Sequence, residues 1–250
     1  MKDINELKAD ISFWTDFYED DCRDDYDCFS WASNKAYLDM NRTMTFRDIP
    51  KNKSQKEKDR IDNQRKDWRD KGTQIIKKTM QKNTNNFNEW HKCVCKELID
   101  LYGNDKLVVR DKNIRTEQST KLTYGQAQKW LNMTLKYLWL LNRLGLISDE
   151  NTREFIQTHK KSFHVPLDRY ILRYVAKIDK NSKDKFCLDN SLDSSVDFSS
   201  FWQLFGSAWS QIDSEEKYYE YQDNLARAIK KGSPLKWELV HWHKAIKYYG

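Results

Sequence analysis

Two side chains in the middle of the chain, Lys129 and Asp168, have the types and settings that nucleophilic catalysis requires. Lys129 stands at the start of a strongly apolar segment, where burial would strip water from its amine and favour the neutral, nucleophilic form. The positive end of a helix dipole would act in the same direction. Lys136 follows two helical turns later on nearly the same face, so it competes for this role. A lysine whose amine simply reaches the solvent is the simpler alternative.

The candidate carboxylate, Asp168, follows the run Val165-Pro166-Leu167. Proline is favoured in the first turn of a helix, so we expect Pro166 to lead a helix with Asp168 in its first turn. An acid in that turn compensates the helix dipole. A carboxylate there can also orient a nucleophile or stabilise a developing cation, so capping and catalysis are compatible roles.

The element that must position Lys129 is the apolar run around it. Apolar residues between Trp130 and Leu144 leave almost no polar face, which is typical of an enclosed central helix. We expect this helix over residues 124–144, with Gly145 ending it. Lys136 and Asn142 interrupt the apolar run, which argues against a transmembrane span.

Most of the remaining chain also shows apolar residues at helical spacing. The other segments that we expect to be helical are residues 4–19, 30–38, 68–80, 87–101, 149–159, 166–175, 214–231 and 234–246. Residues 106–110 are the only strand-like run, while 111–122 and 179–200 are expected to be polar connectors. Seven glycines and three prolines in 250 residues agree with an all-α fold, a single globular multi-helix domain with two helical lobes as the alternative. The lobes would be an N-terminal helical region, 1–105, and a C-terminal region, 106–250, that carries the candidate site.

Charge is distributed unevenly along the chain. The formal net charge is +6, yet residues 1–30 hold ten acids against three bases, and residues 51–82 hold twelve bases against five acids. The simpler explanation of the two charged runs is that they form two solvated helix faces. The more specific explanation is that the basic run forms an arm that contacts phosphate groups. Five cysteines without a framework spacing, and no signal peptide, lead us to expect a cytoplasmic protein without a membrane partner.

The segments Gly125-Gln-Ala-Gln-Lys129 and Val165-Pro-Leu-Asp168 together resemble the helix–hairpin–helix DNA glycosylases, in particular the 8-oxoguanine branch. The resemblance implies an all-helical enzyme that excises a modified base from duplex DNA, with DNA lyase activity as a second step and no cofactor. It places the Schiff-base nucleophile on Lys129 and the assisting aspartate on Asp168. Repair and defence against foreign DNA are both compatible with this activity.

The same resemblance assigns DNA contacts to residues within or next to the two motifs. The residues expected to contact the nucleic acid are Gly125, Gln126, Gln128, Trp130 and His164. Trp130, Trp202 and Trp209 are available to hold an extruded base. The likeness covers about fifty residues; the hairpin has one glycine where the family has two, and 39 residues separate lysine from aspartate.

Two other functions fit parts of the sequence. Arg153 and His159 resemble the arginine-to-histidine motif of HEPN ribonucleases, which cleave RNA without a metal. A non-catalytic helical module that binds nucleic acid or protein through the basic run is the second alternative. We expect no metal site, because His91, Cys93 and Cys95 do not gather on one helix face, although His91 and Cys95 share one.

Overall fold

The computed structural model describes residues 27–41, 54–82, 84–102, 106–110, 115–119, 122–176, 192–193, 195–196, 209–230 and 232–249. The helix expected over residues 4–19, most of the connector expected over 179–200, and Trp202 lie outside these ranges. Within them the chain is all-α apart from one small hairpin, as the sequence predicts.

The expected central helix is α5 (Tyr124–Arg143), and every residue from 124 to 141 except the half-buried Gln126 is buried. It begins with a capping box. The Gln126 backbone N–H donates to Thr123 Oγ1 at 3.1 Å, and the Thr123 N–H donates to Gln126 Oε1 at 3.1 Å. At the other end Gly145 adopts φ 75°, a conformation that favours glycine, and so ends the helix where the sequence predicts.

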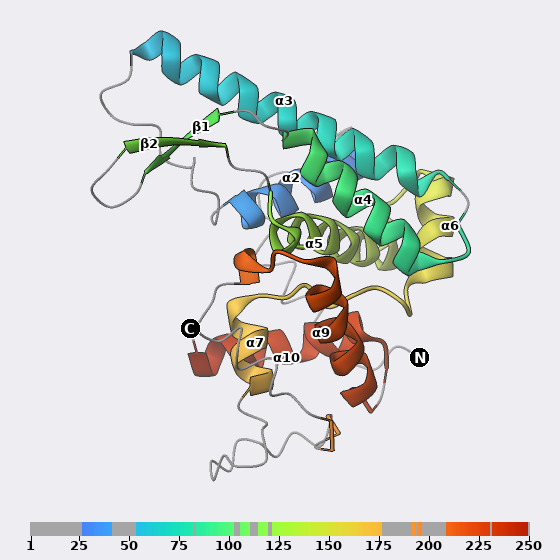
Figure 1. Ribbon diagram of the computed structural model, residues 1–250. Coiled ribbons are helices and arrows are strands. Elements are labelled where there is room, and N and C mark those ends of the chain that lie inside the picture. The colour runs from blue at the N-terminus through green and yellow to red at the C-terminus, as the bar shows by residue number, and fades with distance from the viewer. Residues whose placement is uncertain are drawn as a thin grey trace.

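Helices pack around α5 from both sides (Figure 1). On one side lie α2 (Cys28–Asn41), α3 (Gln55–Met80) and α4 (Phe87–Tyr102). On the other lie α7 (Arg169–Ala176), α9 (Glu215–Ala228), α10 (Pro234–Tyr249) and the short helix η3 (Trp209–Gln211), while α6 (Glu150–His159) packs near the C-terminal end of α5. Apolar residues from all these elements form one core cluster, so the proposed regions 1–105 and 106–250 share a core.

The side chain of Trp130 connects the central helix to α2 by a hydrogen bond and to α3 by close packing. Its indole N–H donates to the Ser33 carbonyl oxygen on α2 at 3.0 Å. A Cβ added at Gly72 would lie 2.0 Å from the Trp130 ring, so only glycine lets α3 cross the indole this closely. The side chain of Trp130 is fully buried as a result.

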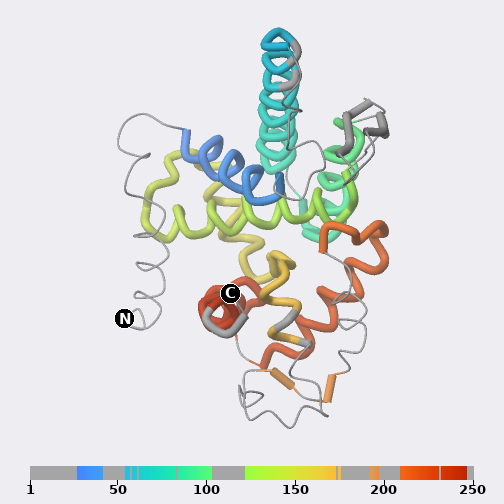
Figure 2. The backbone as a smooth tube through the Cα atoms, turned by 90° about the vertical axis from the view of Figure 1, so that its left-hand side faces the viewer, coloured from blue at the N-terminus to red at the C-terminus, as the bar shows by residue number. Residues whose placement is uncertain are grey.

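The N-terminal half of α3 projects away from the rest of the molecule (Figures 1 and 2). From Trp68 onward the helix buries one residue or more in each turn, whereas no side chain described between Gln55 and Asp67 is buried. The sequence predicts this contrast, because the run 51–60 has almost no apolar residue to bury. We name residues 55–67 the α3 arm.

A two-stranded antiparallel hairpin joins α4 to α5 in sequence. Strand β1 (Lys106–Arg110) confirms the strand-like run, and β2 (Arg115–Ser119) lies in the segment expected to be a connector. Lys106 pairs with Ser119 and Arg110 with Arg115. None of the helices in the described residues has the length and apolar content needed to cross a lipid bilayer.

Candidate active site

Asp168 caps helix α7. Its Oδ1 accepts hydrogen bonds from the backbone N–H groups of Tyr170 at 2.9 Å and Ile171 at 2.8 Å. Helix α7 begins at Arg169, so Pro166 lies in the irregular segment before the cap. The expectation that Pro166 leads this helix is therefore wrong. A side chain that can accept these two bonds sets the start of the helix instead.

The structure brings Lys129 and Asp168 together. Lys129 Nζ lies 3.5 Å from Asp168 Oδ2, and the side chains are 7 % and 15 % exposed. Asp168 Oδ2 also accepts a hydrogen bond from the Trp242 indole N–H at 2.9 Å, and Lys129 Nζ lies 5.6 Å from the centroid of the Trp209 ring. An enclosed amine therefore meets a carboxylate whose position is fixed by α7 and α10, with an aromatic ring beside the amine.

A second ion pair lies on the same face of α5, and the sequence did not reveal it. Lys136 Nζ lies 2.8 Å from both carboxylate oxygens of Glu238 on α10, with side chains 2 % and 1 % exposed. The Trp242 ring centroid lies 5.3 Å from Lys136 Nζ, so this indole touches both pairs. Burial raises the pKa of Glu238, and the Lys136 ammonium opposes that rise.

The two pairs form an ionic core of two lysines and two carboxylates (Lys129, Asp168, Lys136 and Glu238). Lys136 is held by two short contacts deep in the protein, whereas Lys129 has one longer contact and a more exposed side chain. Of the two competing lysines, Lys129 is therefore the one better placed to react. An isolated buried charge is costly, so each carboxylate also keeps its lysine in the core.

The first turn of α5 is covered by the chain's own backbone. The Gly125 N–H donates to the Ile212 carbonyl oxygen at 2.9 Å, and a Cβ at Gly125 would lie 2.1 Å from the Trp209 carbonyl oxygen. Gln126 serves in the capping box, and the fully buried Gln128 donates to the Gly125 carbonyl oxygen at 2.8 Å. In this conformation these three residues support α5 rather than present a DNA-binding hairpin.

We predict that Gly125→Ala destabilises the protein by about 1–2 kcal/mol, because the added methyl group must displace the Trp209–Ile212 backbone, at a cost only partly offset by alanine's helix propensity. Urea unfolding followed by tryptophan fluorescence measures this change. Gln74→Ala, on an exposed position of α3, is the control and should leave stability within about 0.5 kcal/mol. An unchanged midpoint in Gly125→Ala would mean that the turn is not packed against α5.

Trp130 and His164, also expected to contact DNA, are buried. Trp130 is enclosed between α5, α2 and α3, and so is not positioned to hold a base. His164 is 8 % exposed, with Nδ1 2.9 Å from the Tyr218 hydroxyl and Nε2 3.1 Å from Asn88 Oδ1. Of the tryptophans expected to hold a base, Trp209 is the one that the structure places beside Lys129.

His91 and Cys95 share one face of α4, as expected, with Cys95 Sγ 3.8 Å from His91 Nδ1. Burial lowers the pKa of His91 to about 3 and raises that of the Cys95 thiol, so neither group is charged at neutral pH. Within the described ranges no three potential ligands come together in a way that would hold a metal ion. The two residues serve the packing of α4 against α5.

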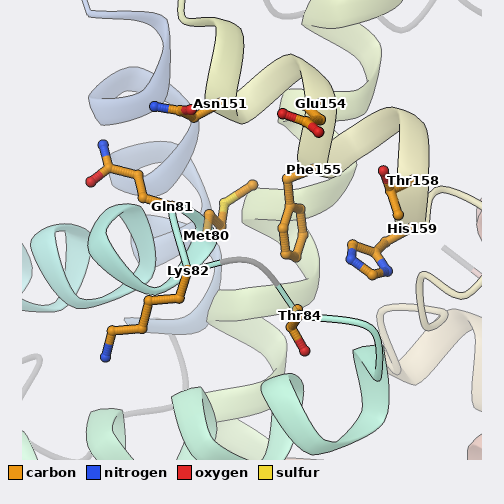
Figure 3. A pocket seen from close by; sticks show the side chains of 9 residues that line it. All are labelled: Met80, Gln81, Lys82, Thr84, Asn151, Glu154, Phe155, Thr158 and His159. Atoms are coloured by element: carbon orange, nitrogen blue, oxygen red, sulfur yellow. The ribbon is translucent and has the colours of Figure 1, made fainter.

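Arg153 and His159 do not share a face of α6. Six residues separate them by roughly 240° around the axis. Arg153 is exposed, whereas His159 is 7 % exposed and lines a pocket of about 180 Å³ that does not include Arg153. Figure 3 shows Phe155 and His159 extending from α6 toward this pocket; Lys82 and Thr84 line it from another side, and the Lys82 amine is directed away from both rings. The pair expected of a HEPN ribonuclease is not assembled within this helix.

Comparisons with known proteins add nothing to the geometry of the ionic core. No protein-family model, no curated protein and no solved structure matches this chain.

Proposed function

We propose that this protein is a DNA N-glycosylase in which Lys129 attacks the sugar of a damaged or modified nucleotide. The observation that carries the proposal is the contact of Lys129 Nζ with Asp168 Oδ2 at 3.5 Å, in a nearly enclosed setting. These are the lysine and aspartate that the resemblance to helix–hairpin–helix glycosylases singles out, 39 residues apart in sequence. A catalytic amine needs an adjacent group that takes its proton and steadies the cation that forms.

In the proposed reaction Asp168 takes a proton from Lys129, and the neutral amine attacks C1′ of the extruded nucleotide. The C1′–N bond breaks, the base leaves with the electron pair, and Asp168 passes the proton from Lys129 on to it. Opening of the sugar ring then gives a protonated Schiff base between Lys129 and C1′. The Asp168 carboxylate, regenerated by that transfer, stabilises the positive charge of the Schiff base. The Trp209 ring, 5.6 Å from the amine, offers the entering base a surface for stacking.

The test is borohydride trapping with a panel of duplexes that carry modified bases. Wild-type protein should form a covalent adduct with at least one of them, because borohydride reduces a Schiff base to a stable amine. Lys129→Gln should lose this adduct completely while its binding to the same duplex changes less than about threefold, since glutamine keeps the size of the side chain.

Lys217→Gln is the matched control, because Lys217 is an exposed lysine of α9 whose side chain is 60 % accessible. It should trap as well as wild type does. Undiminished trapping by Lys129→Gln would refute Lys129 as the nucleophile, and the absence of an adduct with every duplex would refute glycosylase chemistry through a lysine.

Electrostatic binding of nucleic acid without catalysis is a second candidate, which the charge of helix α3 favours. The whole helix carries nine bases against five acids, and its N-terminal half, the α3 arm, projects from the body. Phosphate contacts of this kind weaken steeply with salt. The double variant Lys129→Ala/Asp168→Ala separates the two candidates, because a catalyst loses turnover and keeps the salt dependence of binding. If the wild-type protein binds DNA and shows no turnover on any duplex, the binding module is the function.

A further inference from the structure

A polar cleft of about 450 Å³, lined by none of the four residues of the ionic core, lies where α4, α9 and the connector between α6 and α7 meet. The start of α4 contributes Asn86 and Asn88, the connector contributes Lys161 and His164, and α9 contributes Asp223. Pockets of a few hundred cubic ångströms with a few polar groups are the usual size of small-molecule sites. None of the functions considered above uses this cleft.

A chain of hydrogen bonds behind the cleft determines which polar atoms of its lining face a ligand. The buried amide of Gln128 donates to the Gly125 carbonyl oxygen, which leaves Gln128 Oε1 to accept from Asn132 Nδ2 at 2.8 Å. Asn132 Nδ2 also donates to the Tyr218 hydroxyl oxygen at 2.8 Å. Because the Tyr218 hydroxyl oxygen accepts a hydrogen bond from Asn132, its own O–H is left to donate to the next residue of the chain. The donor and acceptor of each following hydrogen bond are set in the same way.

The onward partner of Tyr218 is His164. Burial holds the pKa of His164 well below its usual value, so its ring is neutral and has one donor and one acceptor. Nδ1 accepts from Tyr218 at 2.9 Å, so the proton is on Nε2, which donates to Asn88 Oδ1 at 3.1 Å. The carbonyl end of Asn88 is thereby turned toward His164, and the amide nitrogen, a donor, is what Asn88 offers to a ligand.

A separate contact orients the Asn86 side chain so that its amide nitrogen, too, is left to donate to a ligand. Its Oδ1 accepts from the Glu89 N–H at 3.2 Å, which caps α4 and leaves its amide nitrogen as the donor. The cleft thus presents two oriented amide donors at the start of α4 and the ammonium of the exposed Lys161 from the connector. The Asp223 carboxylate on α9 is an acceptor, so one part of the lining suits an anion and another suits a hydroxyl group.

We propose that this cleft binds a sugar phosphate, with the phosphate at Asn86, Asn88 and Lys161 and a sugar hydroxyl at Asp223. Phosphate oxygens accept the hydrogen bonds that the two amides and the ammonium offer. The sugar hydroxyl donates to Asp223, whose negative charge would repel a second phosphate. The volume of about 450 Å³ exceeds what a phosphate alone fills, which leaves space for the sugar. A free nucleotide and the phosphorylated end of a nucleic-acid strand both contain this group.

The decisive variant is Asn88→Asp. Aspartate keeps an oxygen for His164 Nε2–H and favours the first turn of α4, so the protein stays folded. The change replaces the donor that faces the ligand with a second negative charge. In isothermal titration calorimetry we expect wild type to bind ribose 5-phosphate and adenosine 5′-monophosphate, and Asn88→Asp to bind each at least tenfold more weakly. Lys161→Gln should show a similar loss.

The neighbouring Lys160, which does not line the cleft, provides the control: Lys160→Gln should bind as wild type does. Ribose and inorganic phosphate should each bind at least tenfold more weakly than ribose 5-phosphate. Oligonucleotides with and without a 5′-phosphate identify the source: stronger binding of the phosphorylated strand than of the mononucleotide points to a strand end, and the reverse to a free nucleotide. Binding should persist in Lys129→Gln, so this test is independent of the glycosylase proposal.

The proposal is overturned if neither sugar phosphate gives a binding isotherm, or if Asn88→Asp binds as tightly as wild type does. Inorganic phosphate that binds as tightly as ribose 5-phosphate would also overturn it, because the sugar would then make no contribution.

Discussion

Replacing Lys136 with methionine should lower the free energy of unfolding by about 3–5 kcal/mol, because it leaves the Glu238 carboxylate buried without its partner. Glu238 is 1 % exposed and both its oxygens lie 2.8 Å from Lys136 Nζ, so water does not replace the missing ammonium. Urea unfolding at pH 7.5, followed by tryptophan fluorescence, measures the loss.

The double variant Lys136→Met/Glu238→Leu is the essential companion. It removes both charges from the core, and buried ion pairs replaced by apolar residues of similar volume are often neutral or stabilising. We therefore expect it to recover at least half of the stability that Lys136→Met loses. A single variant that costs less than about 1 kcal/mol would show that the pair is not enclosed, contrary to the exposures of 2 % and 1 %.

Stability should fall steeply as the pH is lowered from about 6.5 toward 4. Burial lowers the pKa of His91 from 6.5 to about 3 and that of His164 well below 6.5, so both rings stay neutral in the folded protein. In the unfolded chain both take up a proton below about pH 6.5, which favours unfolding. With two protons involved, the free energy of unfolding should drop by about 2.7 kcal/mol per pH unit in the steepest part.

Other groups modify this slope without reversing it. His159, whose pKa is also lowered by burial, acts in the same direction. Glu238 acts in the opposite direction, since its raised pKa makes its contribution largest at low pH and reduces it as the pH rises above about 4.5. In His164→Asn, which removes one of the two rings, the slope should fall by about half. Equal unfolding free energies at pH 7.5 and pH 5 would contradict the neutral histidine network.

The sequence predicts the helices well where local signals agree with burial. The end of α5 follows from Gly145, and the start of α10 follows from Pro234. Helix α7 shows the limit of such signals, because the side chain of Asp168, not Pro166, determines where it begins. Strand β2 is polar throughout, so neither apolar alternation nor β-propensity sets it apart from a connector.

The candidate site is predicted only in part, for a physical reason. The proximity of Lys129 and Asp168 follows from a family resemblance, whereas the partner of Lys136 lies 102 residues away and no local pattern connects them. The one available signal is a lone acid between apolar residues, Trp237-Glu238-Leu239, in the last helix. Sequence spacing also did not show which residues near Lys129 are accessible to a ligand. Gln128 precedes Lys129 by one position, and a step of about 100° around the helix places its side chain in the protein interior.

Helix α10 supplies both groups that complete the ionic core, Glu238 to Lys136 and the Trp242 indole to Asp168. A nascent chain that has reached the end of α9 already contains both lysines and the aspartate of the core, but it lacks Glu238, which neutralises Lys136, and Trp242, which orients Asp168. Such an intermediate cannot close around α5 without burying an ammonium alone. Translation that stops before residue 238 should therefore leave a product that chaperones retain and proteases clear, so that only a chain synthesised through α10 accumulates in its native form.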